Sequence, residues 1–192
     1  FLIFFISLIF FYKILQKRFN SVFLSTMGVL FLIFTPRIFA ESFYNSKDIV
    51  FMSLFIISLY ASLIFIEKPN YKNAIFFTLF CSLAIGTRLL GIILPVLIFF
   101  IYLLNELKSN KFKKKTVGLL VAIFFLTPFF TTLFWPYLWE NPVLNFLEII
   151  KKLSSLELYI YNFYLGNYVD ARSLPWHYSL IWQIITIPIY YT

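Results

Sequence analysis

The sequence consists of long apolar blocks separated by short polar stretches that are rich in lysine and arginine. Most blocks hold 16 to 20 residues, the length with which an α-helix crosses roughly 30 Å of hydrocarbon. Hydrophobic residues make up 61% of the chain, whereas soluble domains are about 45 to 50% apolar. The sequence therefore predicts an all-α fold, a polytopic transmembrane helical bundle with about seven spanning or part-spanning helices.

The block boundaries predict one membrane domain over residues 1–192, because no repeat and no low-complexity linker divides the sequence. The expected spans are 1–12, 21–40, 49–66, 74–87, 89–104, 116–135 and 176–192. The run from 74 to 104 is divided at Arg88, because a charged residue at the centre of a span costs several kcal/mol in lipid. Both ends of the sequence fall within apolar runs, so we expect the chain to begin and end inside spanning segments.

Residues 136–175 differ from the blocks, since they hold tryptophan and several tyrosines among charged residues. Aromatic rings of this kind favour the headgroup layer of a membrane, so we expect an outer interfacial loop here. Within it, residues 143–158 carry apolar side chains near helical spacing, which is typical of a helix that lies in the interface plane.

The basic residues are concentrated in three loops, at 12–20, 67–73 and 105–115, which together hold ten of the sixteen lysines and arginines. Alternating the predicted spans places all three loops on one side, which the positive-inside rule makes cytoplasmic. The net charge of +8 thus reflects membrane topology, and no nucleic-acid partner is expected. The high content of Phe, Ile, Lys and Asn is typical of an AT-rich genome, so we expect a multi-pass protein of a bacterial inner membrane.

The outward turn from Arg37 to Asp48 contains two bases and two acids within twelve positions, namely Arg37, Glu41, Lys47 and Asp48. Cationic side chains donate to phosphate and carboxylates accept from sugar hydroxyls, so this turn is a candidate substrate site. The alternative is a solvated turn whose charges pair locally. Asp48 also begins a helix, where a carboxylate can cap free amide groups and interact favourably with the helix dipole.

Two further residues are candidates for substrate binding. Arg88 lies in the second outward turn, and a guanidinium can bind phosphate oxygens in pairs; the alternative is an arginine whose side chain reaches the membrane surface. His177, the one histidine, begins the last span, where it could equally anchor the chain in the interface. Cys81 is the one cysteine, which excludes an internal disulfide, and no metal site is predicted because histidines and carboxylates do not cluster at ligand spacing.

The order of these features resembles the GT-C glycosyltransferases, and most closely family 39 and the ArnT-like group. The resemblance rests on an apolar run before Thr35-Pro36-Arg37, a polar turn that ends in Asp48, a basic loop, and Gly86-Thr87-Arg88 before a further span. Asp48 resembles the acidic residue that opens the fourth helix of that group, and Arg88 resembles the basic residue between its fifth and sixth helices. The segment 175–178 is similar to the element that opens its eighth helix.

This resemblance implies an enzyme that transfers a hexose or pentose from a polyprenyl-phosphate donor to a protein or lipid acceptor on the extracytoplasmic side. It implies that the general-base carboxylate lies in the first outer loop, N-terminal to Phe1, so the catalytic residue is not expected among these residues. It implies no cofactor within this chain, and it leaves open whether the intact protein uses a divalent metal. Together with the charged residues of the outward turn, it gives as candidate substrate contacts Arg37, Glu41, Lys47, Asp48, Arg88 and His177.

Two alternatives stay open at this point. A lipid-linked-sugar flippase or another multi-helix transporter would also need many helices and polar residues that face a cavity. Transporters often have internal repeats and charges near the bilayer midplane, whereas here the charges gather at the outward surface and no repeat is visible. A membrane scaffold without catalytic activity is the second alternative.

Overall fold

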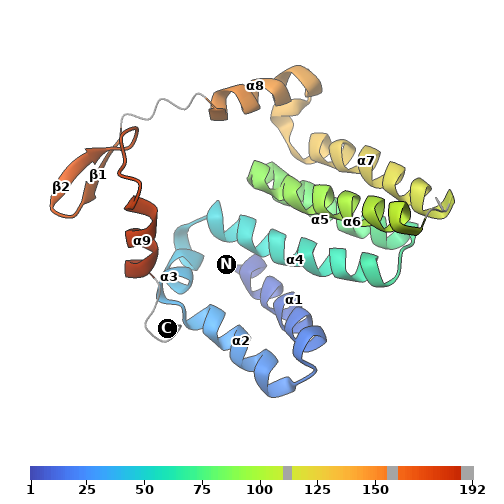
Figure 1. Cartoon of the computed structure of the whole chain (residues 1–192), viewed down its shortest axis with the longest axis horizontal. Coiled ribbons are helices and arrows are strands. Elements are labelled where there is room, and N and C mark those ends of the chain that lie inside the picture. Colours follow the sequence, from blue (N-terminus) through green and yellow to red (C-terminus); the bar gives the residue numbers. More distant parts are fainter. Residues whose placement is uncertain (110–113, 155–159, 187–192) are drawn as a thin grey trace. The chain divides into compact units, whose positions relative to one another are not determined.

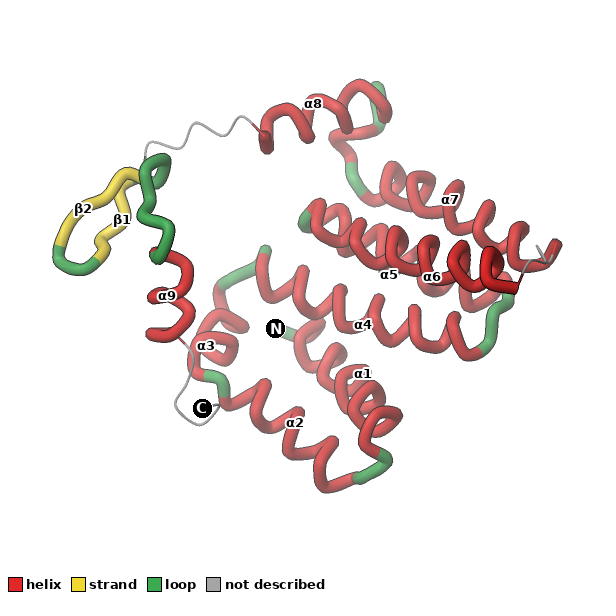
Figure 2. Tube along the Cα trace, viewed as in Figure 1, coloured by secondary structure: helices red, strands yellow, loops and turns green. Residues whose placement is uncertain are grey.

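The structure is a computed structural model in which residues 1–109, 114–154 and 160–186 are described (Figure 1). It divides into two compact units, Phe1–Glu140 and Asn141–Thr192. The first unit contains α1 (Leu2–Phe19), α2 (Val22–Phe34), α3 (Pro36–Tyr44), α4 (Asp48–Glu67), α5 (Tyr71–Thr87), η1 (Leu89–Ile92), α6 (Ile93–Ser109), α7 (Lys114–Phe134) and η2 (Pro136–Leu138). The second contains α8 (Pro142–Ser154), β1 (Tyr161–Tyr164), β2 (Asn167–Asp170) and α9 (Tyr178–Thr186). Figure 2 shows helices throughout the first unit and one hairpin in the second.

The helices confirm the all-α membrane fold that the apolar blocks predict. Among the described residues, α4 and α7 are each long and apolar enough to cross a membrane, and the bent pair of α2 and α3 gives a third candidate span. The 20 residues of α4 extend about 30 Å, close to the thickness of the hydrocarbon layer. The first unit is therefore built around helices of membrane-spanning length.

The predicted span 21–40 is divided in the structure into α2 and α3, which meet at an angle of 63°. Pro36 is the first residue of α3, and Thr35 before it is extended, with a ψ of 111°. Proline disfavours the helical conformation in the residue that precedes it. The Thr35 hydroxyl donates to the carbonyl oxygen of Phe31 at 2.8 Å, which satisfies a carbonyl at the end of α2. Because of this bend, α3 and its charged residues do not continue along the axis of α2.

The core of the first unit lies where α4, α5 and α7 pack side by side (Figure 1). Its buried residues include Phe65 of α4, Phe77 of α5 and Leu119 of α7. Small hydroxyl residues on α4 and α5, such as Ser58 and Ser82, are fully buried and allow the helix backbones to approach closely. Other buried members of this core are Ala61, Ala74, Cys81, Leu94, Ile98 and Ile123.

A buried hydroxyl joins two helices of this core directly. Ser82 of α5 donates to the carbonyl oxygen of Thr127 on α7 at 2.9 Å. Ser53 of α4, by contrast, donates to the carbonyl oxygen of Ile49 within its own helix at 2.7 Å. Hydrogen bonds between helices contribute about 0.6 kcal/mol on average in membrane proteins, so the α5–α7 contact has a modest polar component beside its apolar packing.

The second unit contains a β-hairpin within the region where we expected an interfacial loop. Phe163 pairs with Tyr168 and Tyr164 pairs with Asn167, and the turn between the strands uses positive φ at Leu165 and Gly166. The helix predicted at 143–158 is α8, which ends at Ser154, and residues 155–158 lie outside the described residues. The hairpin therefore adds a small element that the apolar pattern did not indicate.

Candidate functional site

Two turns at the same end of the first unit carry the charged residues that the sequence analysis singled out. Arg37 and Glu41 lie one turn apart on α3, and Asp48 is the first residue of α4. Arg88 lies between the end of α5 and the beginning of η1. The order of helices thus brings a turn near residue 45 next to a turn near residue 88.

An ion pair joins these two turns, since the Nη2 atom of Arg88 donates to the Oδ1 atom of Asp48. The two residues are 40 positions apart in the sequence. The Arg88 side chain is 38% exposed and that of Asp48 is 46% exposed, so both remain accessible to a ligand. The pair connects the N-terminus of α4 with the C-terminus of α5, at the end of the helix core.

The backbone around Arg88 explains why this side chain lies here. Arg88 is extended, with φ −148° and ψ 134°, and it ends α5 with a hydrogen bond from its N–H to the carbonyl oxygen of Ala84 at 2.9 Å. Gly91 then packs against the last turn of α5. A Cβ atom at Gly91 would lie 2.7 Å from the backbone nitrogen of Ile85 and 2.9 Å from the carbonyl carbon of Ala84. Glycine at position 91 therefore permits the close packing against α5 of η1, the element that follows Arg88.

Asn45 lies between the two carboxylates of the site. Its Nδ2 atom donates to Glu41 Oε2 and to Asp48 Oδ2, both at 3.2 Å. Its Oδ1 atom accepts the backbone N–H of Lys47 at 3.2 Å and that of Asp48 at 2.9 Å. The sequence analysis considered a capping role for Asp48. In the structure Lys47 is the residue next to α4 and its side chain makes no capping hydrogen bond, and the Asn45 side chain instead caps the helix by accepting the N–H of its first residue, Asp48. The signal available in the sequence was an asparagine three residues before the first residue of a helix.

Arg37 extends this network on the side of α3. Its Nε atom donates to Glu41 Oε1 at 2.9 Å, and its side chain is 70% exposed. Lys47 lies in the turn next to Asp48 with an exposed side chain. The charged group thus has three cations, Arg37, Lys47 and Arg88, and the two carboxylates of Glu41 and Asp48. Its net charge is +1. Such a group favours an anionic ligand.

His177 lies in the second unit, in the segment before α9. Its ring centroid is 5.8 Å from that of Tyr164 and 5.4 Å from that of Trp176. The structure therefore brings Arg37, Glu41 and Arg88 together with Asp48, with Lys47 beside them. Within the second unit, His177 belongs to an aromatic group.

The second unit has an ion pair of its own, between two residues near the end of the hairpin. Arg172 Nη2 donates to Asp170 Oδ2 at 2.9 Å, and the Arg172 backbone N–H donates to Asp170 Oδ1 at the same distance. The hydrogen bond from the Arg172 side chain holds the pKa of Asp170 below its ordinary value. This pair stabilises the local turn after β2.

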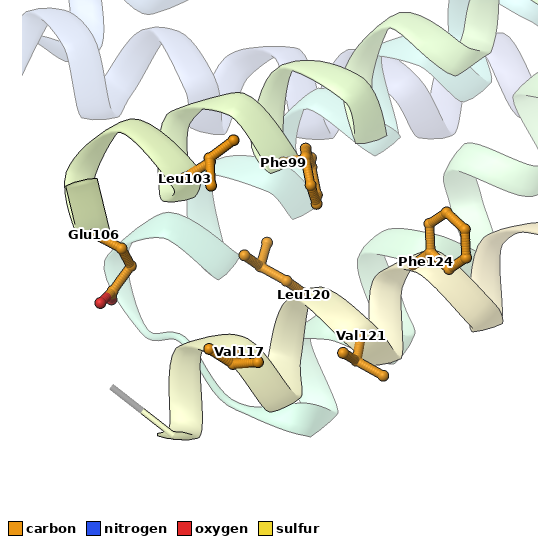
Figure 3. Close-up of a pocket in the computed structure, with 7 residues that line it drawn as sticks. All are labelled: Phe99, Leu103, Glu106, Val117, Leu120, Val121 and Phe124. Atoms are coloured by element: carbon orange, nitrogen blue, oxygen red, sulfur yellow. The ribbon is translucent and has the colours of Figure 1, made fainter. Parts of the chain in front are cut away.

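Two apolar grooves run between α6 and α7. One has a volume of about 340 Å³, and Figure 3 shows Phe99 and Leu103 of α6 opposite Leu120 and Val121 of α7, with the carboxylate of Glu106 at one end. The second groove has a volume of about 500 Å³ and extends to Ile92. Phe99 and Phe124 line both grooves, so apolar surface continues along the seam between the two helices.

The described residues contain no group of three His, Cys, Asp or Glu side chains that could hold a metal ion. The charged group at the end of the bundle is thus a set of guanidinium, ammonium, amide and carboxylate groups. It can bind a phosphate through its cations and sugar hydroxyls through its carboxylates.

Comparison with known proteins identifies the family. Residues 1–135 match the family model of the dolichyl-phosphate-mannose-protein mannosyltransferases, and this range includes all the candidate residues except His177. No curated protein and no solved structure matches the chain. The match covers more than half of the 192 residues and agrees with the resemblance inferred from the motifs. The chain therefore belongs to the dolichyl-phosphate-mannose-protein mannosyltransferase family, a GT-C group of membrane glycosyltransferases that use polyprenyl-phosphate-linked sugars.

Proposed function

We propose that this protein transfers a sugar from a polyprenyl-phosphate donor to a protein or lipid acceptor on the extracytoplasmic side of the membrane. The observation that carries the proposal is the contact of Arg88 with Asp48 at the end of the helix core. Arg37 and Lys47 add two cations there, so the group has a net charge of +1. A polyprenyl-phosphate sugar is a phosphodiester with one negative charge, which this group complements.

The cations have a defined task in the reaction. The oxygen of an acceptor hydroxyl forms a bond with the anomeric carbon while the bond from that carbon to the phosphate oxygen breaks. The phosphate leaves with the electron pair, and the hydroxyl proton passes to a general base. The leaving phosphate gains negative charge during this step, and a guanidinium held in place beforehand stabilises that charge. Arg88 has this role in the proposal, with Arg37 and Lys47 as further phosphate contacts.

The carboxylates serve the sugar and the position of the cations. Arg88 has five N–H groups, and Asp48 accepts from Nη2, so phosphate oxygens can bind the remaining donors. The Asp48 and Glu41 oxygens are acceptors for sugar hydroxyls. His177 stays a candidate contact from the second unit.

The apolar grooves on α6 and α7 offer walls for the prenyl chain. Ile92, at one end of the larger groove, is four positions from Arg88 in the sequence. Phe99, Phe124 and neighbouring aliphatic residues line the seam. A prenyl chain in this seam would begin close to the cation that binds its phosphate.

The side of the membrane is proposed from the distribution of charge. Lys17 and Glu67, from two of the three basic stretches, form an ion pair at the opposite end of α4 from Asp48. The positive-inside rule makes that end cytoplasmic. The site near Arg88 then faces the periplasm or exterior of a bacterial inner membrane.

The proposal is tested with the full-length protein in membranes, by transfer of radiolabelled sugar from polyprenyl-phosphate donors. We expect Arg88→Ala to lower transfer by two orders of magnitude or more, in the range of lost transition-state donors, and Arg88→Lys to retain part of it. Asp48→Asn should lower transfer less than Arg88→Ala. If no donor supports transfer, and the wild-type protein instead moves the donor across the bilayer in a manner that Arg88→Ala abolishes, the protein is a transporter and the proposal fails.

A further inference from the structure

Asn45 uses all of its hydrogen-bonding capacity within the charged group. An asparagine side chain has two donor hydrogens on its nitrogen and two lone pairs on its oxygen. The nitrogen donates to Glu41 and to Asp48, and the oxygen accepts from the backbone of Lys47 and Asp48. Its backbone N–H donates to the carbonyl oxygen of Glu41 at 2.8 Å and ends α3. Asn45 is therefore tied at once to α3 and α4.

The orientation of the Asn45 amide follows from these partners. The amide oxygen faces two N–H groups and the amide nitrogen faces two carboxylates. Turning the amide by 180° would place donors against donors and an acceptor against two anions. These hydrogen-bond partners therefore allow one orientation of the amide, and the amide in turn restrains the positions of the partners.

The contacts of Asp48 show what this fixed amide does. One carboxylate oxygen of Asp48 accepts from Arg88, and the other accepts from Asn45. The carboxylate is consequently held from two sides, and the position of Arg88 follows from it. Asn45 also separates two anions, Glu41 and Asp48, which would repel each other without a donor between them.

We propose that Asn45 is a positioning residue for the donor phosphate: it holds the Asp48 carboxylate in the orientation that presents Arg88, and it ties that pair to Glu41 and Arg37 on α3. This inference rests on the proposed function, in which Arg88 binds the phosphate. Asn45 acts through Asp48 and does not itself touch the donor. The charged groups around it are Arg37, Glu41, Lys47, Asp48 and Arg88.

A purely structural role would need only the amide oxygen, which caps α4. Asn45→Asp separates the two roles, because aspartate keeps an oxygen for the backbone N–H groups and is a good helix cap. It replaces the donor nitrogen with an anionic oxygen and places a third carboxylate beside Glu41 and Asp48. If Asn45 only caps α4, Asn45→Asp should leave sugar transfer unchanged. If Asn45 positions Asp48 and Arg88, this variant should lower transfer.

Asn70 provides the matched control. It caps α5 by accepting the backbone N–H of Asn73 at 2.8 Å, and its side chain is exposed. Among the described contacts its side chain donates to no carboxylate. Asn70→Asp therefore makes the same chemical change at a helix N-terminus without the anionic neighbours.

The experiment measures kcat/KM for the polyprenyl-phosphate donor with the full-length protein in membranes, at matched protein amounts, from pH 5 to pH 8. We expect Asn45→Asp to lower kcat/KM about tenfold or more at pH 8, the loss typical of one hydrogen bond to a charged group. As the pH falls, a proton on the introduced carboxyl group restores a donor, and kcat/KM returns toward the wild-type value at the same pH. Asn70→Asp should match the wild type at every pH.

Two further variants complete the design. Asn45→Ser keeps a capping oxygen, loses the reach to both carboxylates and adds no charge, so it should lower kcat/KM about threefold to tenfold at every pH. This variant carries the test if Asn45→Asp does not accumulate in the membrane. In an Arg88→Ala background, Asn45→Ser should have little further effect, because its action passes through Arg88.

Wild-type kinetics in Asn45→Ser, a loss in Asn45→Asp that does not change with pH, or losses that add in the double variant would each overturn the inference. Arg88→Ala in the same assay distinguishes this from failure of the proposed function. If Arg88→Ala leaves kcat/KM unchanged, the phosphate assignment fails. If Arg88→Ala lowers it and Asn45→Ser does not, the role of Asn45 alone fails.

Discussion

The two ends of α4 make the same kind of contact with different structural support. Its first residue, Asp48, pairs with Arg88, and its last residue, Glu67, pairs with Lys17. Both pairs join residues that are distant in sequence, by 40 and by 50 positions. At the Asp48 end an asparagine side chain holds the carboxylate, whereas at the Glu67 end the neighbouring interaction is that of Lys17 with the Tyr60 ring, 5.8 Å from its centroid.

This difference shows that an ion pair alone does not make a substrate-binding site. Lys17 and Glu67 are long side chains with exposed fractions of 34% and 52%, and exposed pairs of this kind contribute about 0 to 1 kcal/mol. Arg88 and Asp48 have similar exposed fractions, 38% and 46%, but the backbone on both sides is fixed by Gly91 and by Asn45. The end of α4 that we propose binds substrate therefore differs from the other end in its restrained backbone and in the restrained Asn45 amide.

Exchanging the two charges of each pair should give the largest difference between the ends. The double variant Asp48→Arg with Arg88→Asp places a carboxylate where we propose that the phosphate binds, so we expect sugar transfer to fall more than about 100-fold. The double variant Lys17→Glu with Glu67→Lys keeps the charge of the other end and should stay within about twofold of wild type. Transfer of radiolabelled sugar by membranes with matched protein amounts measures both. Equal losses at the two ends would remove the distinction between them.

Gly91→Ala tests whether the backbone positions Arg88. The added Cβ meets backbone atoms of α5 at 2.7 and 2.9 Å, and overpacking of this kind costs about 1 to 3 kcal/mol. We expect η1 to shift and transfer to fall about tenfold. Gly86→Ala is the matched control, because a Cβ there meets no atom within 4 Å, and it should retain wild-type transfer. A Gly91→Ala protein with full activity would show that Arg88 does not depend on this contact.

Ser82→Ala tests the helix core that lies between the two ends of α4. The variant removes the hydrogen bond to Thr127 of α7, so the free energy of unfolding in detergent should fall by about 0.6 kcal/mol. Ser53→Ala removes a bond within α4 and should change that free energy less. Transfer should be unchanged in both variants. A larger loss in Ser53→Ala than in Ser82→Ala would contradict the assignment of the interhelical bond.

The smallest effect is expected for Asp170 with Arg172, a pair whose residues are two positions apart in sequence. The Asp170 pKa is lowered in the folded protein, so its stabilising effect is present above the ordinary aspartate pKa of about 3.9. That effect is lost as the pH falls through the lowered pKa. The protection of the hairpin amides from hydrogen exchange should therefore not change with pH near neutrality, and exchange should accelerate beyond the intrinsic pH trend only in strong acid. Asp170→Asn should abolish the acid-dependent part.

The sequence predicts the part of this molecule that follows from hydrophobic length and from charge. Blocks of spanning length predict the helices, and the cost of Arg88 in lipid predicts a turn at that residue. The acids and bases between Arg37 and Asp48 indicate a charged turn at the end of the helices. Each of these inferences depends on local composition, which a single sequence contains in full.

Other features depend on contacts that no local pattern specifies. The contact of Asp48 with Arg88 spans 40 positions, and the role of Asn45 becomes visible only when two carboxylates are placed around its amide. The break at Thr35 had a local signal in Pro36, but the apolar run continued past it and the prediction kept 21–40 as one span. The hairpin has strands of four residues each, too short to stand out among interfacial tyrosines.

The packing of Gly91 has a consequence for how this protein can change over evolution. Its partners are main-chain atoms of Ala84 and Ile85, which every amino acid provides in the same form. Substitutions among the apolar side chains of α5 and α6 therefore leave this contact intact as long as the two helices keep their course. The backbone course at Arg88 is thus insulated from drift in the apolar sequence around it, and its preservation depends chiefly on the glycine at position 91.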